Sequence, residues 1–151
     1  MTFDVSDSHI QMRVISQPQY LCAIRNMINI IGGKCGLSST ETDHAVLAVD
    51  EATTNIIRHG YKDAPDQFIN VAIRPLNDTA GQGMEIIIDD QCKDVSPDQI
   101  QERDLSVLKP GGLGIHILYR IMDHVHFEQR PDMQGIRLTL RKYHKPQENG
   151  S

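Results

Sequence analysis

Apolar and polar residues follow two spacings that divide the chain into strands and helices. Over residues 9–16 apolar residues occupy every second position, which predicts a first strand. Apolar residues three and four apart predict helices over residues 20–36, 37–60 and 112–125. Runs rich in β-branched residues between turn-forming stretches predict four more strands, at residues 68–76, 84–90, 125–130 and 136–143.

Local signals indicate where the first two helices begin and end. The pair Gly32-Gly33 is expected to weaken or end the first helix. Ser38, followed three residues later by Glu41, forms a capping box, which predicts the start of the second helix. Gly60 supplies the C-terminal stop of that helix.

The order of these elements predicts one domain over residues 1–151 with an α/β (α+β) fold. Strands come in neighbouring pairs with helices between the pairs, which favours a two-layer sandwich: a mixed, mostly antiparallel sheet with helices on one face. Residues 77–83 are rich in turn formers and predict a hairpin with a long loop. The predicted core spans residues 10–143, and residues 144–151 are expected to form a disordered tail.

Charge and composition argue against several classes of function. The 151 residues carry a net charge of −5 without a basic patch or stripe, which argues against direct nucleic-acid binding. The three cysteines are odd in number and scattered, so neither a disulfide framework nor a cysteine metal site is expected. No signal peptide is evident, and no apolar run approaches the about 18 residues of a membrane span. We therefore expect a soluble cytoplasmic protein.

A polar stripe follows the second predicted helix. Glu51, Asn55 and His59 are four residues apart and share one helix face. Such a stripe is typical of a solvated helix flank, but Asn is a poor helix former and needs a reason to occupy mid-helix. Its carboxamide oxygen can bind Mg²⁺, and Glu51 can accept a proton. The small Ala48 and Ala52 are expected to leave room for a ligand, whereas His59 is expected to interact with the helix dipole.

Two further stretches carry candidate chemistry. The strand at 84–90 ends in Asp89 and Asp90, and a carboxylate there can accept a hydrogen bond from a base, bind metal or face solvent. Residues 91–112 exceed the usual length of a loop, and loops of more than about 12–15 residues are usually functional or disordered. The glycine-rich "KPGGLGIHIL" at 109–118 opens a helix whose free N–H groups can bind phosphate. It matches neither the Walker nor the Rossmann pattern.

In combination these motifs resemble the GHKL (Bergerat-fold) ATPases, and within them the small anti-sigma-factor serine-protein kinases of the RsbW type. The stretch "AVDEATTNIIRHGY" at residues 48–61 is similar to the N-box of that family. The stretch "IIIDDQCKD" at 86–94 stands where the first glycine box falls, and "GGLGIHILYRIMD" at 111–123 is similar to the second. The resemblance covers residues 10–143.

The resemblance implies ATP and Mg²⁺ as cofactors and a role for each motif. Asn55 is implied to hold Mg²⁺ against the phosphates, and Glu51 to act as general base toward a serine hydroxyl. Asp89 is implied to accept a hydrogen bond from the adenine amino group, and residues 91–112 to form a lid over the nucleotide. The residues implied to contact phosphate are Lys109, Gly111, Gly112 and Gly114.

The resemblance also implies protein partners. The family phosphorylates a serine on a small STAS-domain antagonist and holds a sigma factor in complex until the antagonist competes. The family is commonly dimeric, so a homodimer is implied. Phosphoryl transfer depends mostly on positioning and charge stabilisation, so few side chains are needed.

The first glycine box departs from the family pattern Asp-x-Gly-x-Gly. Gln91 and Lys93 occupy the two glycine positions. If either position needs a positive φ, a residue other than glycine costs on the order of 1 kcal/mol. Lys93 could instead reach phosphate, and Asp90 is an alternative residue for the contact with the base.

Two other functions stay open at this point. The altered glycine box favours a binding module that sequesters a protein partner, with ATP bound statically or not at all. A metal hydrolase would use Glu51, His59 and the pair His124 and His126, but a metal site needs further ligands at defined geometry.

Overall fold

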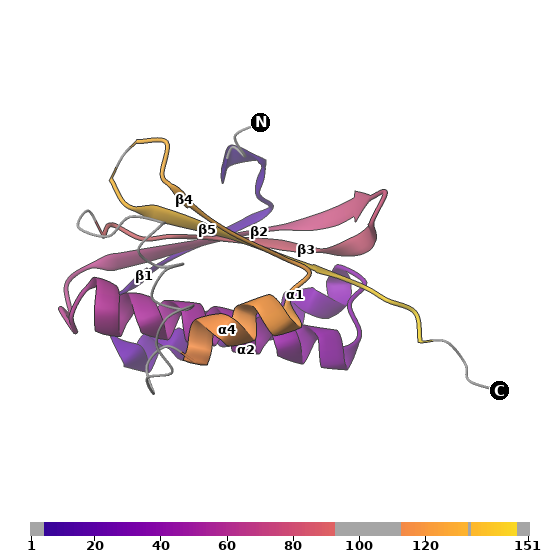
Figure 1. The fold of residues 1–151 in the computed structure, drawn as a ribbon, viewed down its shortest axis with the longest axis horizontal. Helices are drawn as coiled ribbons and strands as arrows, with labels where there is room; N and C mark the ends of the chain where they lie inside the picture. Colours follow the sequence, from indigo (N-terminus) through magenta and orange to yellow (C-terminus); the bar gives the residue numbers. More distant parts are fainter. Residues whose placement is uncertain (1–4, 93–112, 133, 148–151) are drawn as a thin grey trace.

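The computed structural model describes residues 5–92, 113–132 and 134–147. Within these residues a five-stranded sheet is covered on one face by helices, as Figure 1 shows. The strands are β1 (Ile10–Ile15), β2 (Phe68–Asp78), β3 (Gly81–Asp89), β4 (His124–Gln129) and β5 (Ile136–Tyr143). The helices are α1 (Leu21–Lys34), α2 (Ser39–Asn55) and α4 (Leu113–Ile121), with two 3₁₀ turns, Val5–Asp7 and Pro18–Tyr20, and a π-helical turn η3 (Ile56–Gly60).

The sheet has the strand order β1-β2-β3-β5-β4, and each of these neighbouring pairs is antiparallel. The predicted α+β sandwich with helices on one face is therefore confirmed. None of the helices in the described part of the chain has the length and apolar character needed to cross a membrane.

The β2–β3 hairpin is tighter than the sequence suggested. Asp78 pairs with Gly81, so only two residues form the turn, and the prediction of a long loop is wrong. Gly81 has a φ of +118°, which favours glycine, and the Asp78 carboxylate accepts a hydrogen bond from the Ala80 amide at 2.9 Å. The polar residues of this stretch thus extend both strands.

Helix α1 includes its glycine pair and ends one residue later, at Lys34, so Gly32-Gly33 lies in the last turn and does not itself end the helix. A Cβ added at Gly32 would lie 2.5 Å from Oγ1 of Thr42 on α2. Gly32 therefore lets two helices approach closely, and this packing outweighs its poor helix propensity. The chain turns after the helix, at Gly36, where φ is +88°.

Helix α2 begins with the predicted capping box. The Ser38 hydroxyl accepts from the Glu41 amide at 3.1 Å, and the Glu41 carboxylate accepts from the Ser38 amide at 2.8 Å. Glu41 also holds the start of the expected tail, because its two oxygens bind the His144 ring and the Lys145 amide, each at 2.8 Å. Residues 148–151 lie outside the described part of the chain.

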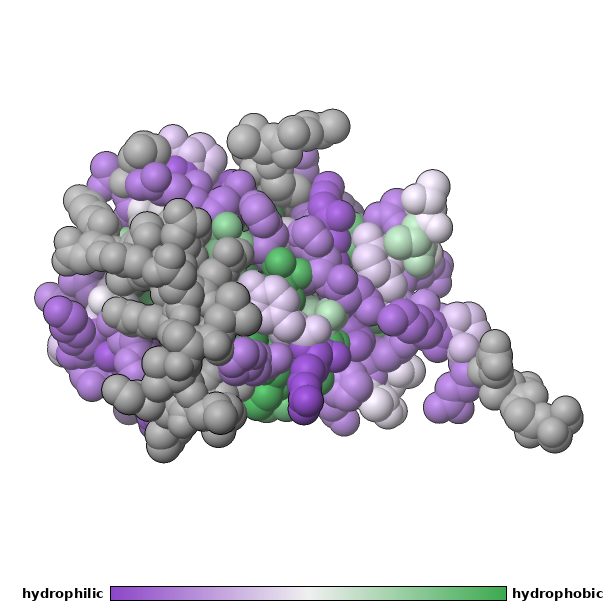
Figure 2. Space-filling model, viewed as in Figure 1, coloured by the Kyte–Doolittle hydropathy of each residue, from purple (hydrophilic) through white to green (hydrophobic). Residues whose placement is uncertain are grey.

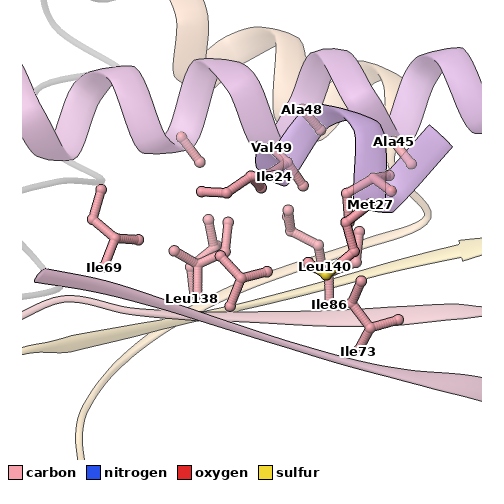
Figure 3. Close-up of a cluster of buried hydrophobic side chains, with 14 of the residues drawn as sticks. Ile24, Met27, Ala45, Ala48, Val49, Ile69, Ile73, Ile86, Leu138 and Leu140 are labelled. Atoms are coloured by element: carbon pink, nitrogen blue, oxygen red, sulfur yellow. The ribbon is translucent and has the colours of Figure 1, made fainter. Parts of the chain in front are cut away.

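The core lies between the helices and the inner face of the sheet (Figure 3). Ala48 is fully buried and Ala52 is 5% exposed, so these alanines belong to the core. The expectation that they leave room for a ligand is therefore wrong. Their small size lets α2 lie close to its neighbours, among them α4. On the side seen in Figure 2, hydrophilic residues predominate and apolar residues appear only in small areas. The residues labelled in Figure 3 are Ile24, Met27, Ala45, Ala48, Val49, Ile69, Ile73, Ile86, Leu138 and Leu140.

The helix-free face of the sheet is held by charge pairs. The Glu85 side chain is fully buried between two arginines, with Arg74 Nε 2.7 Å and Arg141 Nε 2.5 Å from its oxygens. Side chains alternate between the two faces of a strand, so every second residue counted from Glu85 along β3, Ile87 and then Asp89, shares this face. Asp89 therefore lies on the face opposite the helices.

Candidate functional site

Asn55 is the last residue of α2 and is followed directly by the π-helical turn η3. The widened turn is closed by a hydrogen bond of 2.7 Å from the Tyr61 amide to the Ile56 carbonyl. Single π turns within α-helices are frequent at functional sites. Because the turn is wider, His59 does not continue the four-residue spacing of the stripe, and its side chain is exposed.

The side-chain amide of Asn55 lies at this helix end with a nitrogen atom, Nδ2, that is buried and lacks a hydrogen-bond partner among the described residues. Leaving such a group unpaired costs about 1–3 kcal/mol, and native proteins rarely tolerate it without a ligand, water or function. Glu51 is half-buried one turn earlier and forms no hydrogen bond or ion pair with described residues. Within the described part of the chain, neither the Nδ2 atom of Asn55 nor the Glu51 carboxylate is therefore engaged by another side chain or by the backbone.

These residues also fit a magnesium ion, since a carboxamide oxygen is a ligand that Mg²⁺ accepts alongside waters and phosphates. The described residues contain no group of three or more His, Cys, Asp or Glu that could hold a metal. Glu51, His59, His124 and His126 are all within the described part of the chain. The metal-hydrolase hypothesis built on these four residues is therefore wrong.

Asp89 and Asp90 have separate surroundings although they are adjacent in sequence. Asp89 receives two parallel hydrogen bonds from Arg137, Nε to Oδ1 at 2.8 Å and Nη2 to Oδ2 at 2.9 Å. This contact raises the pKa of the Arg137 guanidinium. Both side chains are nearly buried on the helix-free face, so Asp89 is engaged in a structural ion pair away from Asn55 and Glu51.

Asp90 is turned toward the strand end and the helix layer. Its Oδ1 accepts hydrogen bonds from the Cys92 amide at 2.9 Å and from the Ile136 amide at 3.0 Å. Burial raises the pKa of this carboxyl group, and these two hydrogen bonds, together with one from the Cys92 side chain, oppose the rise only in part. A buried carboxyl group at a strand end beside η3 is suited to hydrogen-bond a polar ligand edge.

The altered glycine box carries no backbone strain at its first changed position. Lys62 and Asp63 are the residues other than glycine that have a positive φ in the described chain, so Gln91 does not. The conformation here therefore does not require the glycine that the family pattern has at this point. Lys93 lies outside the described residues.

Of the four residues expected to contact phosphate, Gly114 alone lies within the described part of the chain. Lys109, Gly111 and Gly112 lie outside the described residues, as do residues 93–112 of the lid expected at 91–112. Gly114 is the second residue of α4, at the helix N-terminus where free N–H groups attract anions. Helix α4 packs against α2, the helix that carries Glu51 and Asn55.

Two residues that support Asp90 were not anticipated from the sequence. The Tyr61 hydroxyl accepts a hydrogen bond from the Gln91 amide at 2.7 Å, and Arg130 Nη1 donates to the Asp90 carbonyl at 2.9 Å. Tyr61 is the last residue of the stretch similar to the N-box, but Gln91, its hydrogen-bond partner, is 30 residues away in sequence. Spacing along the chain gives no signal for either contact.

Comparisons with known proteins identify the family of this chain. The family model described as histidine kinase-like ATPase domain matches residues 14–142. The serine-protein kinase RsbW of Bacillus licheniformis (strain ATCC 14580) is 31% identical over 141 residues, which cover 89% of this chain and 85% of the relative. The same-named proteins of Bacillus subtilis (strain 168) and Staphylococcus aureus are each 26% identical, with 89% and 94% of this chain covered and 85% and 91% of the relatives.

A solved structure supports the fold independently of sequence identity. The SiaB–SiaC complex from Pseudomonas aeruginosa contains a chain that matches with a TM-score of 0.56 at 12% identity, and the match covers 89% of each chain. At this identity the likeness concerns the fold alone. The polar helix end, the antiparallel sheet and the sequence matches together show that the chain belongs to the histidine kinase-like ATPase family, in its RsbW-type branch.

Proposed function

We propose that this protein is an ATP-dependent serine-protein kinase and anti-sigma regulatory factor. The observation that carries the proposal is the buried Nδ2 atom of Asn55, which has no hydrogen-bond partner among the described residues and lies one turn from the half-buried Glu51, at a π-helical turn. RsbW-type relatives bear the name serine-protein kinase, which supports the reaction class.

Each side chain has one task in the proposed reaction. Bound Mg²⁺ would neutralise charge on the phosphates, with Asn55 Oδ1 as its protein ligand. The serine oxygen would form a bond to the γ-phosphorus while the bond to the β–γ bridging oxygen breaks, releasing ADP. Glu51 would accept the serine proton. Lys109, Gly111, Gly112 and Gly114 are proposed as the phosphate-binding residues.

For the base contact we propose Asp90 in place of Asp89. Asp89 is engaged by Arg137 on the helix-free face, whereas Asp90 lies beside η3. Oδ1 of Asp90 is held by two backbone amides, so Oδ2 is the proposed acceptor for the adenine amino group.

The proposed partners follow from family membership. They are a STAS-domain antagonist, which carries the acceptor serine, a sigma factor, and a second copy of this chain. The structural neighbour SiaB was solved in complex with SiaC, so a protein of this fold can bind a protein partner. A cytoplasmic location is proposed because the reaction consumes ATP.

The experiment begins with calorimetric titration of ATP in the presence and absence of Mg²⁺. We expect Asn55→Ala to weaken magnesium-dependent binding by at least about tenfold, or about 1.4 kcal/mol. Asn29→Ala is the matched control, since Asn29 is an exposed asparagine on α1. Equal affinity of the wild type and Asn55→Ala would refute the placement of the metal ligand.

The second step distinguishes between two hypotheses: a protein kinase, and a protein that binds a partner without catalysis. The altered glycine box favours the second of these. Purified STAS-domain proteins from the source organism are incubated with labelled ATP and each variant. We expect Glu51→Gln to bind ATP but to transfer phosphate about a hundredfold more slowly, since general-base catalysis typically contributes 10²–10⁴-fold. Wild-type protein that binds ATP and a partner without transferring phosphate would support the alternative.

A further inference from the structure

We infer that Tyr61 is a positioning residue for recognition of the nucleobase, because its hydroxyl holds the Asp90–Cys92 segment in the conformation that aims the Asp90 carboxyl group. The inference rests on the proposed function, in which Asp90 contacts the base. Tyr61 contacts neither the base nor the reacting phosphate in this proposal, and it acts through Gln91.

The Tyr61 hydroxyl joins two strand ends to the N-box helix. It donates to the Phe68 carbonyl at the start of β2 at 2.5 Å and accepts from the Gln91 amide just beyond β3 at 2.7 Å. Tyr61 itself is 8% exposed and directly follows η3. Burial raises the pKa of this phenol, so the hydroxyl keeps the proton with which it donates. The Tyr61 hydroxyl therefore hydrogen-bonds a backbone carbonyl of one strand end and a backbone amide of the other.

Three consecutive amides of the segment have three different acceptors. The Asp90 amide donates to the Ile136 carbonyl at 3.0 Å, the Gln91 amide to Tyr61, and the Cys92 amide to Oδ1 of Asp90. Only the middle contact comes from a side chain outside the segment. Without it, the Gln91 peptide can rotate, and the Cys92 amide that fixes Oδ1 of Asp90 moves with it.

Close packing of η3 against the same segment limits other conformations. A Cβ added at Gly60 would collide with Sγ of Cys92, so the helix end and the segment are in direct contact. With Asp90 as the aspartate that contacts the base, the first glycine position of the pattern Asp-x-Gly-x-Gly falls on Cys92, which has no positive φ. The Tyr61 hydrogen bond to the Gln91 amide thus stabilises an ordinary backbone conformation directly before that position.

The test compares Tyr61→Phe with Tyr143→Phe. Tyr143 is also buried, and its hydroxyl donates to Asp78 Oδ2 at 2.9 Å at the hairpin end of the sheet, remote from Asp90. Affinities for ATP and GTP are measured by calorimetry, because GTP lacks the adenine amino group. Hydrogen exchange of the Gln91 amide is measured by NMR in the protein without nucleotide.

We expect Tyr61→Phe to accelerate exchange at Gln91 and to lower the ratio of ATP to GTP affinity by about tenfold, through weaker ATP binding alone. Tyr143→Phe should lower the melting temperature without changing that ratio. A Tyr61→Phe protein that discriminates ATP from GTP as well as the wild type does refutes the inference and leaves the proposed function intact. Wild-type protein that binds neither nucleotide refutes the proposed function, and with it the role of Tyr61.

Discussion

Substitutions of the two adjacent aspartates should have different effects: Asp89→Asn should lower the free energy of unfolding, and Asp90→Asn should lower the affinity for ATP. Asp89 and Arg137 form a nearly buried pair, with 10% and 8% of their side chains exposed and both hydrogen bonds shorter than 3 Å. Removing one partner of a buried pair typically costs about 3–5 kcal/mol, because the remaining charge is left in a poorly solvated position. Asp89→Asn keeps one acceptor oxygen, so we expect about 3 kcal/mol.

That loss is large enough to measure directly. For a chain of this length about 3 kcal/mol corresponds to a fall of about 6–12 °C in melting temperature. Urea unfolding gives the free energy, and ATP titration is performed below the transition, so that affinity refers to folded protein. We expect Asp89→Asn to bind ATP within about twofold of the wild type, a difference of about 0.4 kcal/mol.

Asp90→Asn should behave in the opposite way. Its Oδ1 can still accept from the Cys92 and Ile136 amides, so the fold is retained. The new Nδ2 then takes the place of Oδ2 and faces the adenine amino group with a donor, which should weaken ATP binding by at least about tenfold.

A double variant controls for the ion pair itself. Asp89→Asn combined with Arg137→Gln removes both charges, and we expect it to recover much of the stability lost in Asp89→Asn. The reasoning is refuted if Asp89→Asn unfolds like the wild type but no longer binds ATP. In that case Asp89, as the family resemblance implied, makes the base contact.

Two further predictions concern helix packing and pH. Gly32→Ala should destabilise the protein by about 1–3 kcal/mol through its clash with Thr42, offset by less than about 1 kcal/mol of helix propensity. Gly33→Ala meets no atom within 4 Å and should stabilise by about 0.5–1 kcal/mol; a urea series that ranks the two variants otherwise contradicts the packing argument. Burial raises the pKa of Glu41, but hydrogen bonds from the His144 ring and two backbone amides outweigh it, and the pKa is about 2 against an ordinary 4.5. Its contribution to stability is therefore present above pH 4.5 and is lost as the pH falls toward 2. The melting temperatures of the wild type and Glu41→Gln should converge over that range, and a constant difference would contradict the assignment.

Local patterns determined most of the architecture. Period-two and period-3.6 spacings located the strands and helices, because each element must bury one face. The Ser38–Glu41 capping box is a contact between residues three apart, so it could be predicted without knowing the fold. The polar pair Glu51 and Asn55 was also visible, since both lie on one helix.

Only the tertiary structure decided which side chains and backbone groups of distant segments contact one another. Adjacent residues of a strand point to opposite faces, and the packing of helices decides which face becomes a site; this is why Asp89 and Asp90 could not be told apart in the sequence. Gly32 continues a helix because Thr42, on another helix, lies against it. Tyr61 acquires its role from an amide 30 residues away. Such contacts depend on the relative placement of packed elements, which local propensity and spacing do not encode.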